Sequence, residues 1–376
     1  MALAAQPVTT LVVTGGFVIA TLFGAIANKT NFCTMGALSD VVVMGHWSRL
    51  RMWLLAMAVA MLGAGALAYS GQVNFANSVV QRPNLSWLSL LVGGLSFGVG
   101  MTLAGGCANR NLIRLGGGSV RSLVVLVFIA IAAYMTLKGL FGQWRATLLD
   151  PVAINLADHG WKDQSLATAL ARLTGMAPRT ALPLATGVVA LALLFFVFKD
   201  RRFRSSGAQV AGAAALGALV VAGWYLSGHV GFGESPDTLE DVYFGTNSHL
   251  AESLSFVGPL AYGLELLMLW TDASLHVTFG IACAAGVAVG SAAYALAARR
   301  FRWEGFASLN DLRNQLVGAV LMGFGGVTAL GCTIGQGISG ISTLAIGSFI
   351  ALFGIIAGST TTLRILQRMD EDADAA

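Results

Sequence analysis

Charged residues are scarce in this chain. Only 11% of its 376 residues are Asp, Glu, Lys or Arg, whereas a soluble domain has about 25%. Hydrophobic residues make up 56%, and apolar runs near the roughly 18 residues that indicate a bilayer span recur along the chain. This composition excludes an ordinary soluble domain and predicts an all-α polytopic membrane protein that contacts the lipid bilayer.

Cysteine and histidine are also rare, with four and five copies. The sequence has no C-x-x-C pair and no Cys/His cluster at metal-ligand spacing, so we expect no metal site and no cofactor. The net charge of +4 comes from short basic loops, which in a membrane protein report topology. A basic soluble surface is absent, so we expect no nucleic-acid partner.

Long apolar runs predict about nine transmembrane helices, at 9–28, 52–71, 86–104, 120–140, 181–198, 208–228, 275–298, 313–330 and 342–361. Two further apolar stretches, 31–45 and 253–270, are shorter or broken by glycine and proline. Their length and context predict short re-entrant half-helices.

Two segments of the chain align without gaps. "LVGGLSFGVGMTLAGGC" (91–107) matches "LVGAVLMGFGGVTALGC" (316–332), and the final Gly-Cys pair is shared. Upstream, "NFCTMGALSDVVVMGHW" (31–47) resembles "SFVGPLAYGLELLMLW" (255–270), which sets Cys33 over Val257. The two anchors are separated by nearly the same interval in both halves, so the sequence predicts a tandem repeat.

Loop charges predict how the two halves face. The basic stretches 46–51, 110–121, 199–204 and 299–302 are expected in the cytoplasm, and the acidic loop 233–241 outside. The N-terminus is then outside, the C-terminus is cytoplasmic, and the repeat has inverted topology. We expect residues 1–140 to form the first repeat, 141–207 a connecting region with one helix, and 208–362 the second repeat. Residues 363–376 form an acidic cytoplasmic tail, and we expect its last part, 369–376, to be disordered.

The predicted helix breaks contain three of the four cysteines. Cys33 lies in 28–36, Cys107 in 105–119 and Cys332 in 331–340. Inverted repeats of transporters hold substrate near the midplane, where discontinuous helices direct their N-termini inward. We therefore interpret these three thiols as substrate-binding, and Cys283, within an uninterrupted apolar run, as a packing residue.

Polar residues beside the breaks are candidate supporting residues. A structural role is the alternative for these residues, because a broken helix needs polar side chains to form hydrogen bonds with its free backbone groups. For Lys29 the alternative is a position at the membrane interface. The candidates are Lys29, Asn31, Asn109, Asn111, Thr333 and Gln336.

A thiol is a weak donor and a weak acceptor, so a ladder of thiols would pass a soft anion without holding it tightly. The motifs "NFCTMGALSD", "GGCANRNLIRLGGGSVRSLVVL" and "GCTIGQGISG" resemble those of the YeeE/YedE family of sulfur-transport membrane proteins. The resemblance spans residues 10–362. It implies an hourglass-shaped inner-membrane protein that imports thiosulfate past Cys33, Cys107 and Cys332, with a separate TusA-like cytoplasmic sulfur carrier as partner.

Three alternatives remain open at this point. The same cysteines suit a membrane thiol oxidoreductase or sulfur transferase, although such an enzyme needs an accessible thiolate of lowered pKa. The sequence is equally compatible with a transporter of another sulfur or selenium species. A scaffold that anchors a sulfur carrier without transport is the third alternative. We expect a transporter and not an enzyme.

Overall fold

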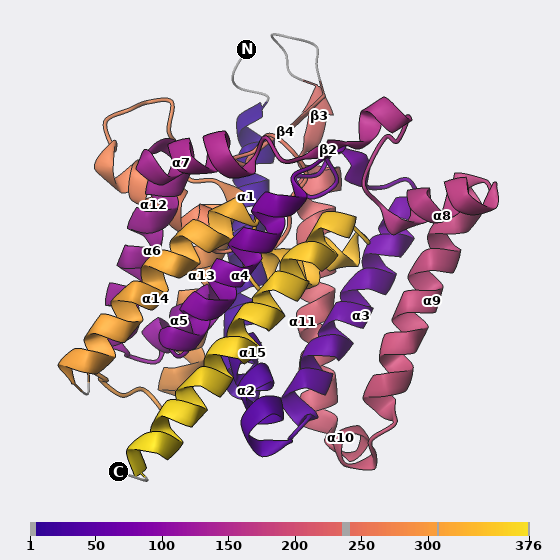
Figure 1. Ribbon diagram of the computed structural model, residues 1–376. Coiled ribbons are helices and arrows are strands. Elements are labelled where there is room, and N and C mark those ends of the chain that lie inside the picture. The colour runs from indigo at the N-terminus through magenta and orange to yellow at the C-terminus, as the bar shows by residue number, and fades with distance from the viewer. Residues whose placement is uncertain (1–4, 235–240, 307, 375–376) are drawn as a thin grey trace.

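The apolar runs form helices at all the expected positions (Figure 1). The computed structural model describes residues 5–234, 241–306 and 308–374. Its long helices are α1 (Ala5–Thr30), α3 (Ser48–Tyr69), α4 (Trp87–Leu103), α6 (Val120–Lys138), α9 (Pro178–Phe198), α11 (Gly207–Tyr225), α13 (Phe279–Ala297), α14 (Leu309–Thr328) and α15 (Ile346–Asp374).

Eight spans of the described chain are long and apolar enough to cross a membrane. The exception among the long helices is α14, whose first two turns carry Asp311, Arg313 and Gln315. A polar start of this kind suits a helix that emerges from the bilayer into water. The prediction of an all-α polytopic membrane protein is confirmed.

The shorter elements occupy the breaks and loops. The two short apolar stretches are α2 (Thr34–Met44) and α12 (Val257–Met268), and the other short helices are α5 (Ala108–Gly116), α7 (Leu140–Trp144), α8 (Leu166–Thr174) and α10 (Arg201–Ser205). Single turns are η1 (Phe75–Asn77), η2 (Arg145–Leu149), η3 (Leu156–His159), η4 (Leu226–Val230) and η5 (Gly335–Gly340). Two antiparallel pairs are β1 (Asn84–Leu85) with β2 (Ile154–Asn155), and β3 (Phe232–Glu234) with β4 (Asp241–Tyr243).

The acidic tail differs from its prediction of disorder. Helix α15 continues through Asp374, because the segment after Thr362 holds no glycine or proline that would end it. Within the connecting region, α9 is the long helix, and the shorter α8 and α10 flank it. Most of the acidic loop 233–241 lies outside the described residues.

Helix pairs in one half of the chain have counterparts in the other half. Helix α4 packs on both α15 and α14, and α14 packs on α6; α1 packs on α13, as α11 packs on α3. Figure 1 shows α4 and α15 running toward the end of the molecule that holds the C-terminus, whereas α14 and α6 run toward the N-terminal end. It also shows α2 near the C-terminal end and α12 near the N-terminal end. This is the arrangement that an inverted repeat requires.

Glycines let the two aligned helices meet backbone to backbone. A Cβ on Gly93 would lie 2.9 Å from the Gly325 carbonyl oxygen, and one on Gly325 would lie 2.5 Å from the Gly93 oxygen. Gly100 and Gly318 repeat this reciprocal contact, at 2.6 and 2.5 Å. In the sequence alignment Gly93 matches Gly318 and Gly100 matches Gly325, so the α4–α14 contact is self-complementary, as a two-fold axis demands. Small residues of this kind allow close packing in a membrane, where apolar side chains alone give little driving force.

Candidate functional site

Each motif cysteine lies where a helix breaks. Cys33 is the N-cap of α2 and Cys107 is the N-cap of α5, both with extended backbone. Cys332 lies between the end of α14 and the π-turn η5. The breaks therefore aim helix N-termini, which carry partial positive charge, at the thiols.

Two of the thiols accept a backbone hydrogen bond at the same spacing. The Gly36 N–H donates to Cys33 Sγ at 3.3 Å, and the Gly335 N–H donates to Cys332 Sγ at 3.4 Å. Both donors follow their cysteine by three residues, as in a capped helix start. These hydrogen bonds fix the orientation of the two cysteine side chains.

The three motifs meet in one place. The Cys33 and Cys107 thiols are within side-chain hydrogen-bonding reach of each other, and the Thr333 hydroxyl is within reach of Cys107. Because Thr333 directly follows Cys332, the path of contact runs from Cys332 through Cys107 to Cys33. The structure thus brings together three segments that are distant in sequence.

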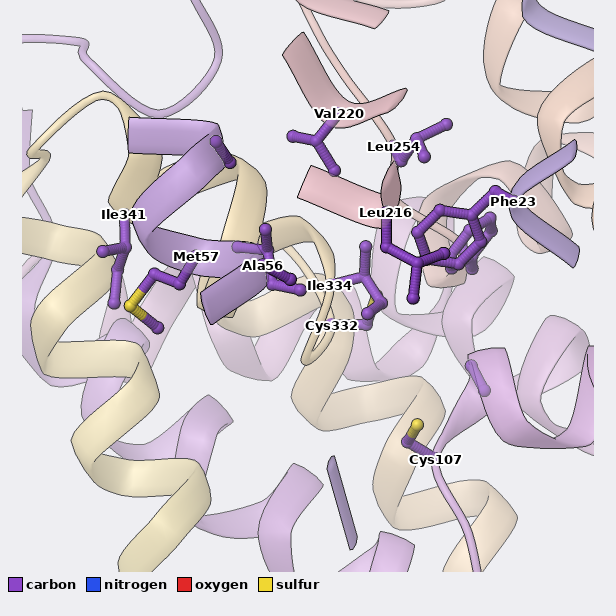
Figure 2. Packing of buried hydrophobic residues seen from close by; sticks show 14 of the residues in the cluster. Phe23, Ala56, Met57, Cys107, Leu216, Val220, Leu254, Cys332, Ile334 and Ile341 are labelled. Atoms are coloured by element: carbon purple, nitrogen blue, oxygen red, sulfur yellow. The ribbon is translucent and has the colours of Figure 1, made fainter. Parts of the chain in front are cut away.

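The thiol cluster is closed off by apolar side chains. Cys107 and Cys332 have no exposed surface, and Cys33 is 7% exposed. Figure 2 shows Cys332 beside Ile334, with Cys107 below it, inside the buried hydrophobic cluster that includes Phe23, Met57 and Leu216. The thiols therefore lie in a closed, apolar setting, where interactions with an ion are strong.

Three polar side chains next to the thiols lack a hydrogen-bond partner other than a thiol. The hydroxyls of Thr34 and Thr333 and both amide atoms of Asn109 are buried without a partner of good geometry. All three residues are at most 3% exposed. Buried polar atoms are nearly always paired, and each unpaired group costs about 1–3 kcal/mol. Such a concentration indicates groups that are available to a polar ligand.

Two other candidate residues hold the breaks together. The Asn111 side-chain amide donates to the carbonyls of Gly106 and Cys107, at 3.1 and 3.2 Å. The Gln336 amide donates to the Ala329 carbonyl at 2.8 Å and accepts from Ser348. Each amide follows its cysteine by four residues and satisfies backbone freed by the break, so both have a structural role.

The remaining candidates lie away from the constriction. Lys29 and Asn31 are exposed at the turn between α1 and α2, and Asn31 takes a left-handed φ of 52° there. Cys283 is buried in the middle of α13 and donates to the Gly16 carbonyl at 3.4 Å. Within the described residues, no group of three or more His, Cys, Asp or Glu side chains could hold a metal ion.

Arginines surround the Cys33 side of the cluster. The charges of Arg110 and Arg114 act on the Cys33 thiol, and a guanidinium nitrogen of Arg49 lies 2.9 Å from the Cβ position of Gly36. Arg114 donates to the Gly105 carbonyl at 3.1 Å, and Arg49 pairs with Asp40 at 3.3 Å. The site is thus positive on the side of α2 and α5.

A cavity of about 170 Å³ lies on the opposite side of the cluster. Its lining comes from the loop before α12, from α12 itself, from η2 and from the end of α14. Gly331 and Gly335, on either side of Cys332, form part of this lining. The cavity therefore reaches the Cys332 break from the N-terminal end of the molecule.

Sequence reasoning missed Thr34 and the cavity. Thr34 had a detectable signal, because the Cys-Thr pair at 33–34 repeats at 332–333. The cavity had none, since its lining residues are scattered from Val79 to Ser339.

Comparison with known proteins shows which family the chain belongs to. A family model described as "Sulphur transport" matches residues 29–361. The thiosulfate transporter TsuA of Escherichia coli is 26% identical over 366 residues, which cover 92% of each chain. The protein of the same name from Spirochaeta thermophila is 25% identical over 362 residues, covering 94% of this chain and 98% of that relative.

Proposed function

Because the chain belongs to the sulphur transport family, we propose that it imports thiosulfate, or a related small sulfur anion, through a constriction formed by Cys33, Cys107 and Cys332. Membership of the family and its multi-pass helical structure make it a membrane protein of sulfur transport. The proposed substrate rests on the two relatives, both named thiosulfate transporter, and the thiol path rests on the geometry of this chain.

The observation that carries the proposal is the set of unpaired polar groups at the thiol cluster. Thr34, Asn109 and Thr333 each place a hydrogen-bond donor beside a buried cysteine, and none of the three has a partner other than a thiol. Thiosulfate has oxygen atoms at one end and an exposed sulfur atom at the other. The hydroxyls and the amide suit the oxygen atoms, and the weakly donating thiols suit the sulfur.

Weak binding at several positions also suits transport. A lysine or arginine inside the constriction would hold an anion tightly and would be costly to bury. Thiols and hydroxyls give several weak binding sites, one after another along the path of the anion. Weak binding favours release of the anion as well as its entry. The arginines near Cys33, on the side of α2 and α5, then attract the anion after it has passed the thiols.

The orientation of the chain in the membrane follows from charge. Basic residues collect at the end of the molecule that holds α10 and the C-terminus, including Arg201, Arg202 and Arg204. By the positive-inside tendency this end is cytoplasmic. We therefore place the chain in the inner membrane with its N-terminus outside. A separate TusA-like carrier on the cytoplasmic side would take up the imported sulfur.

An experiment with labelled substrate distinguishes transport from thiol chemistry. Proteoliposomes are given thiosulfate that carries ³⁵S either at the outer, sulfane position or at the central position. Transport predicts that both labels accumulate inside at the same rate and that no label remains on the protein.

A sulfur transferase would separate the two labels. It would leave sulfane sulfur on a cysteine as a persulfide, which mass spectrometry would detect, and would release only the central label. That result would overturn the proposed function.

A further inference from the structure

The cavity above Cys332 contains one buried acid. Glu252 lies in the loop before α12 and lines the cavity. Its backbone N–H donates to the Ser227 hydroxyl at 3.2 Å, and that hydroxyl donates to the Glu252 carbonyl. The loop is thus fixed to η4, and the position of the carboxyl group is defined by the fold.

One oxygen of this carboxyl group is unpaired. Glu252 Oε1 is buried and has no hydrogen-bond partner in the described part of the chain. The carboxyl group receives hydrogen bonds from the Asn247 backbone and the Ser248 side chain. A buried carboxylate oxygen without a partner is unfavourable when charged, and a protonated oxygen there would have a free donor.

The neighbouring groups do not neutralise this acid. Arg145 also lines the cavity, but it forms an ion pair with Asp150 at 3.2 Å. Tyr262 faces the cavity from α12, and Cys283 on α13 is near enough to sense the Glu252 charge. The nearby elements also hold two histidines. His229 on η4 forms a hydrogen bond with the Gln72 carbonyl at 3.1 Å, and His249 lies on the same loop as Glu252. Burial raises the pKa of Glu252 to about 7, against the two hydrogen bonds that lower it.

We propose that Glu252 is a proton-dependent entry residue, so that an anion occupies the cavity only while this carboxyl group is neutral. The inference rests on the proposed function, because the cavity is then the outer approach to the thiols. In its protonated form Glu252 donates a hydrogen bond to the anion through Oε1. In its ionised form it places a negative charge beside the anion's path and repels it.

The matching position in the first half of the chain has an amide. In the register that sets Cys33 over Val257, Glu252 corresponds to Asn28, whose side chain donates to Ser291 at 2.8 Å. An uncharged donor at this position is therefore compatible with the repeat, which makes Glu252→Gln a suitable test.

The test is thiosulfate uptake by proteoliposomes with the same pH on both faces and the membrane potential clamped. With a pKa of about 7, wild-type uptake at low substrate should fall about tenfold from pH 6 to pH 8. Glu252→Gln should keep the same rate at both values, close to the wild-type rate at pH 6. Glu234→Gln removes an exposed acid at the same end of the molecule, and this control should keep the wild-type pH dependence.

Several outcomes would overturn the inference. A flat wild-type profile would do so without any variant. A pH-dependent Glu252→Gln profile, or folded Glu252→Gln without uptake at either pH, would do so as well. If Glu252→Gln is not recovered folded, Glu252→Asp must shift the midpoint of the pH profile, and an unchanged midpoint contradicts the proposal. Absence of wild-type uptake at every pH would instead reject the proposed function.

Discussion

At the scale of single residues, the polar groups around the cysteines divide into two sets. Asn111 and Gln336 have their hydrogen bonds satisfied by the broken backbone, whereas Thr34, Asn109 and Thr333 do not. The sequence places all five residues in or beside a break but cannot separate the sets, because the separation depends on which carbonyl lies within reach after folding. Thiol contact between Cys33 and Cys107 likewise requires the packing of two segments that are 74 residues apart.

Replacing Gln336 with alanine tests the structural set. The change removes the donor to the Ala329 carbonyl and the acceptor for Ser348, so we expect a loss of about 1–3 kcal/mol in unfolding free energy. Thermal unfolding in detergent measures it. Thr14→Ala, which removes a hydroxyl bonded only within its own exposed helical turn, is the control. Equal unfolding temperatures for the two variants would contradict the assigned role.

Glu252 predicts a pH dependence of stability. Its pKa is about 7 in the folded protein, against an ordinary value of 4.5, so the folded state favours the neutral acid. The stabilisation is complete below pH 4.5 and is lost as pH rises through 7, by about 3 kcal/mol in all. Glu252→Gln should therefore unfold at a higher temperature than wild type at pH 8, and the difference should vanish at pH 4. The reverse order at pH 8 would show that the buried acid is compensated.

At the scale of elements, hydropathy predicts most of the long helices and glycine predicts their breaks. The nine apolar runs correspond to α1, α3, α4, α6, α9, α11, α13, α14 and α15. The elements that the sequence does not predict are short. Helix α5 begins directly after Cys107, η5 begins three residues after Cys332, and α7, α8 and α10 lie in the connections between long helices. Their formation depends on packing against the long helices, because helices of five to nine residues are unstable alone.

The reciprocal glycine contact gives a prediction for α4. A Cβ at Gly100 would lie 2.6 Å from the Gly318 carbonyl oxygen and 2.8 Å from the Met322 nitrogen, and neither backbone atom can move aside easily. We expect Gly100→Ala to lower the unfolding temperature markedly, measured by the loss of the monodisperse peak on heating in detergent. Gly187→Ala in α9, where a Cβ would meet nothing within 4 Å, should be neutral or slightly stabilising. Similar behaviour of the two variants would contradict the close α4–α14 contact.

At the scale of the whole molecule, the alternating helix directions put the two ends of the chain on opposite faces (Figure 1). The repeat in the sequence predicts this result only when the charges of the loops are added. The alignment gives the paired halves, and the basic stretches give their relative orientation. The assignment of domains at 1–140, 141–207 and 208–362 remains a prediction from the same reasoning.

Topology can be tested directly. A protease-cleavable tag after residue 376 should be protected in spheroplasts and cut in inverted membrane vesicles, because the basic C-terminal end is expected in the cytoplasm. A tag inserted after Glu234, at the end of β3 on the opposite side of the molecule (Figure 1), should give the reverse pattern. Cleavage of the C-terminal tag in intact spheroplasts would contradict the orientation.

The central claim is that the anion passes the motif thiols. The most direct measurement is radiolabelled thiosulfate uptake by cells that lack their own sulfate and thiosulfate importers, comparing wild type, Cys107→Ala and Cys283→Ala at equal expression. Both cysteines are fully buried, but only Cys107 contacts a second thiol. Wild type and Cys283→Ala should take up thiosulfate, and Cys107→Ala should not. Equal uptake by all three would contradict the account and reduce Cys107 to a packing residue.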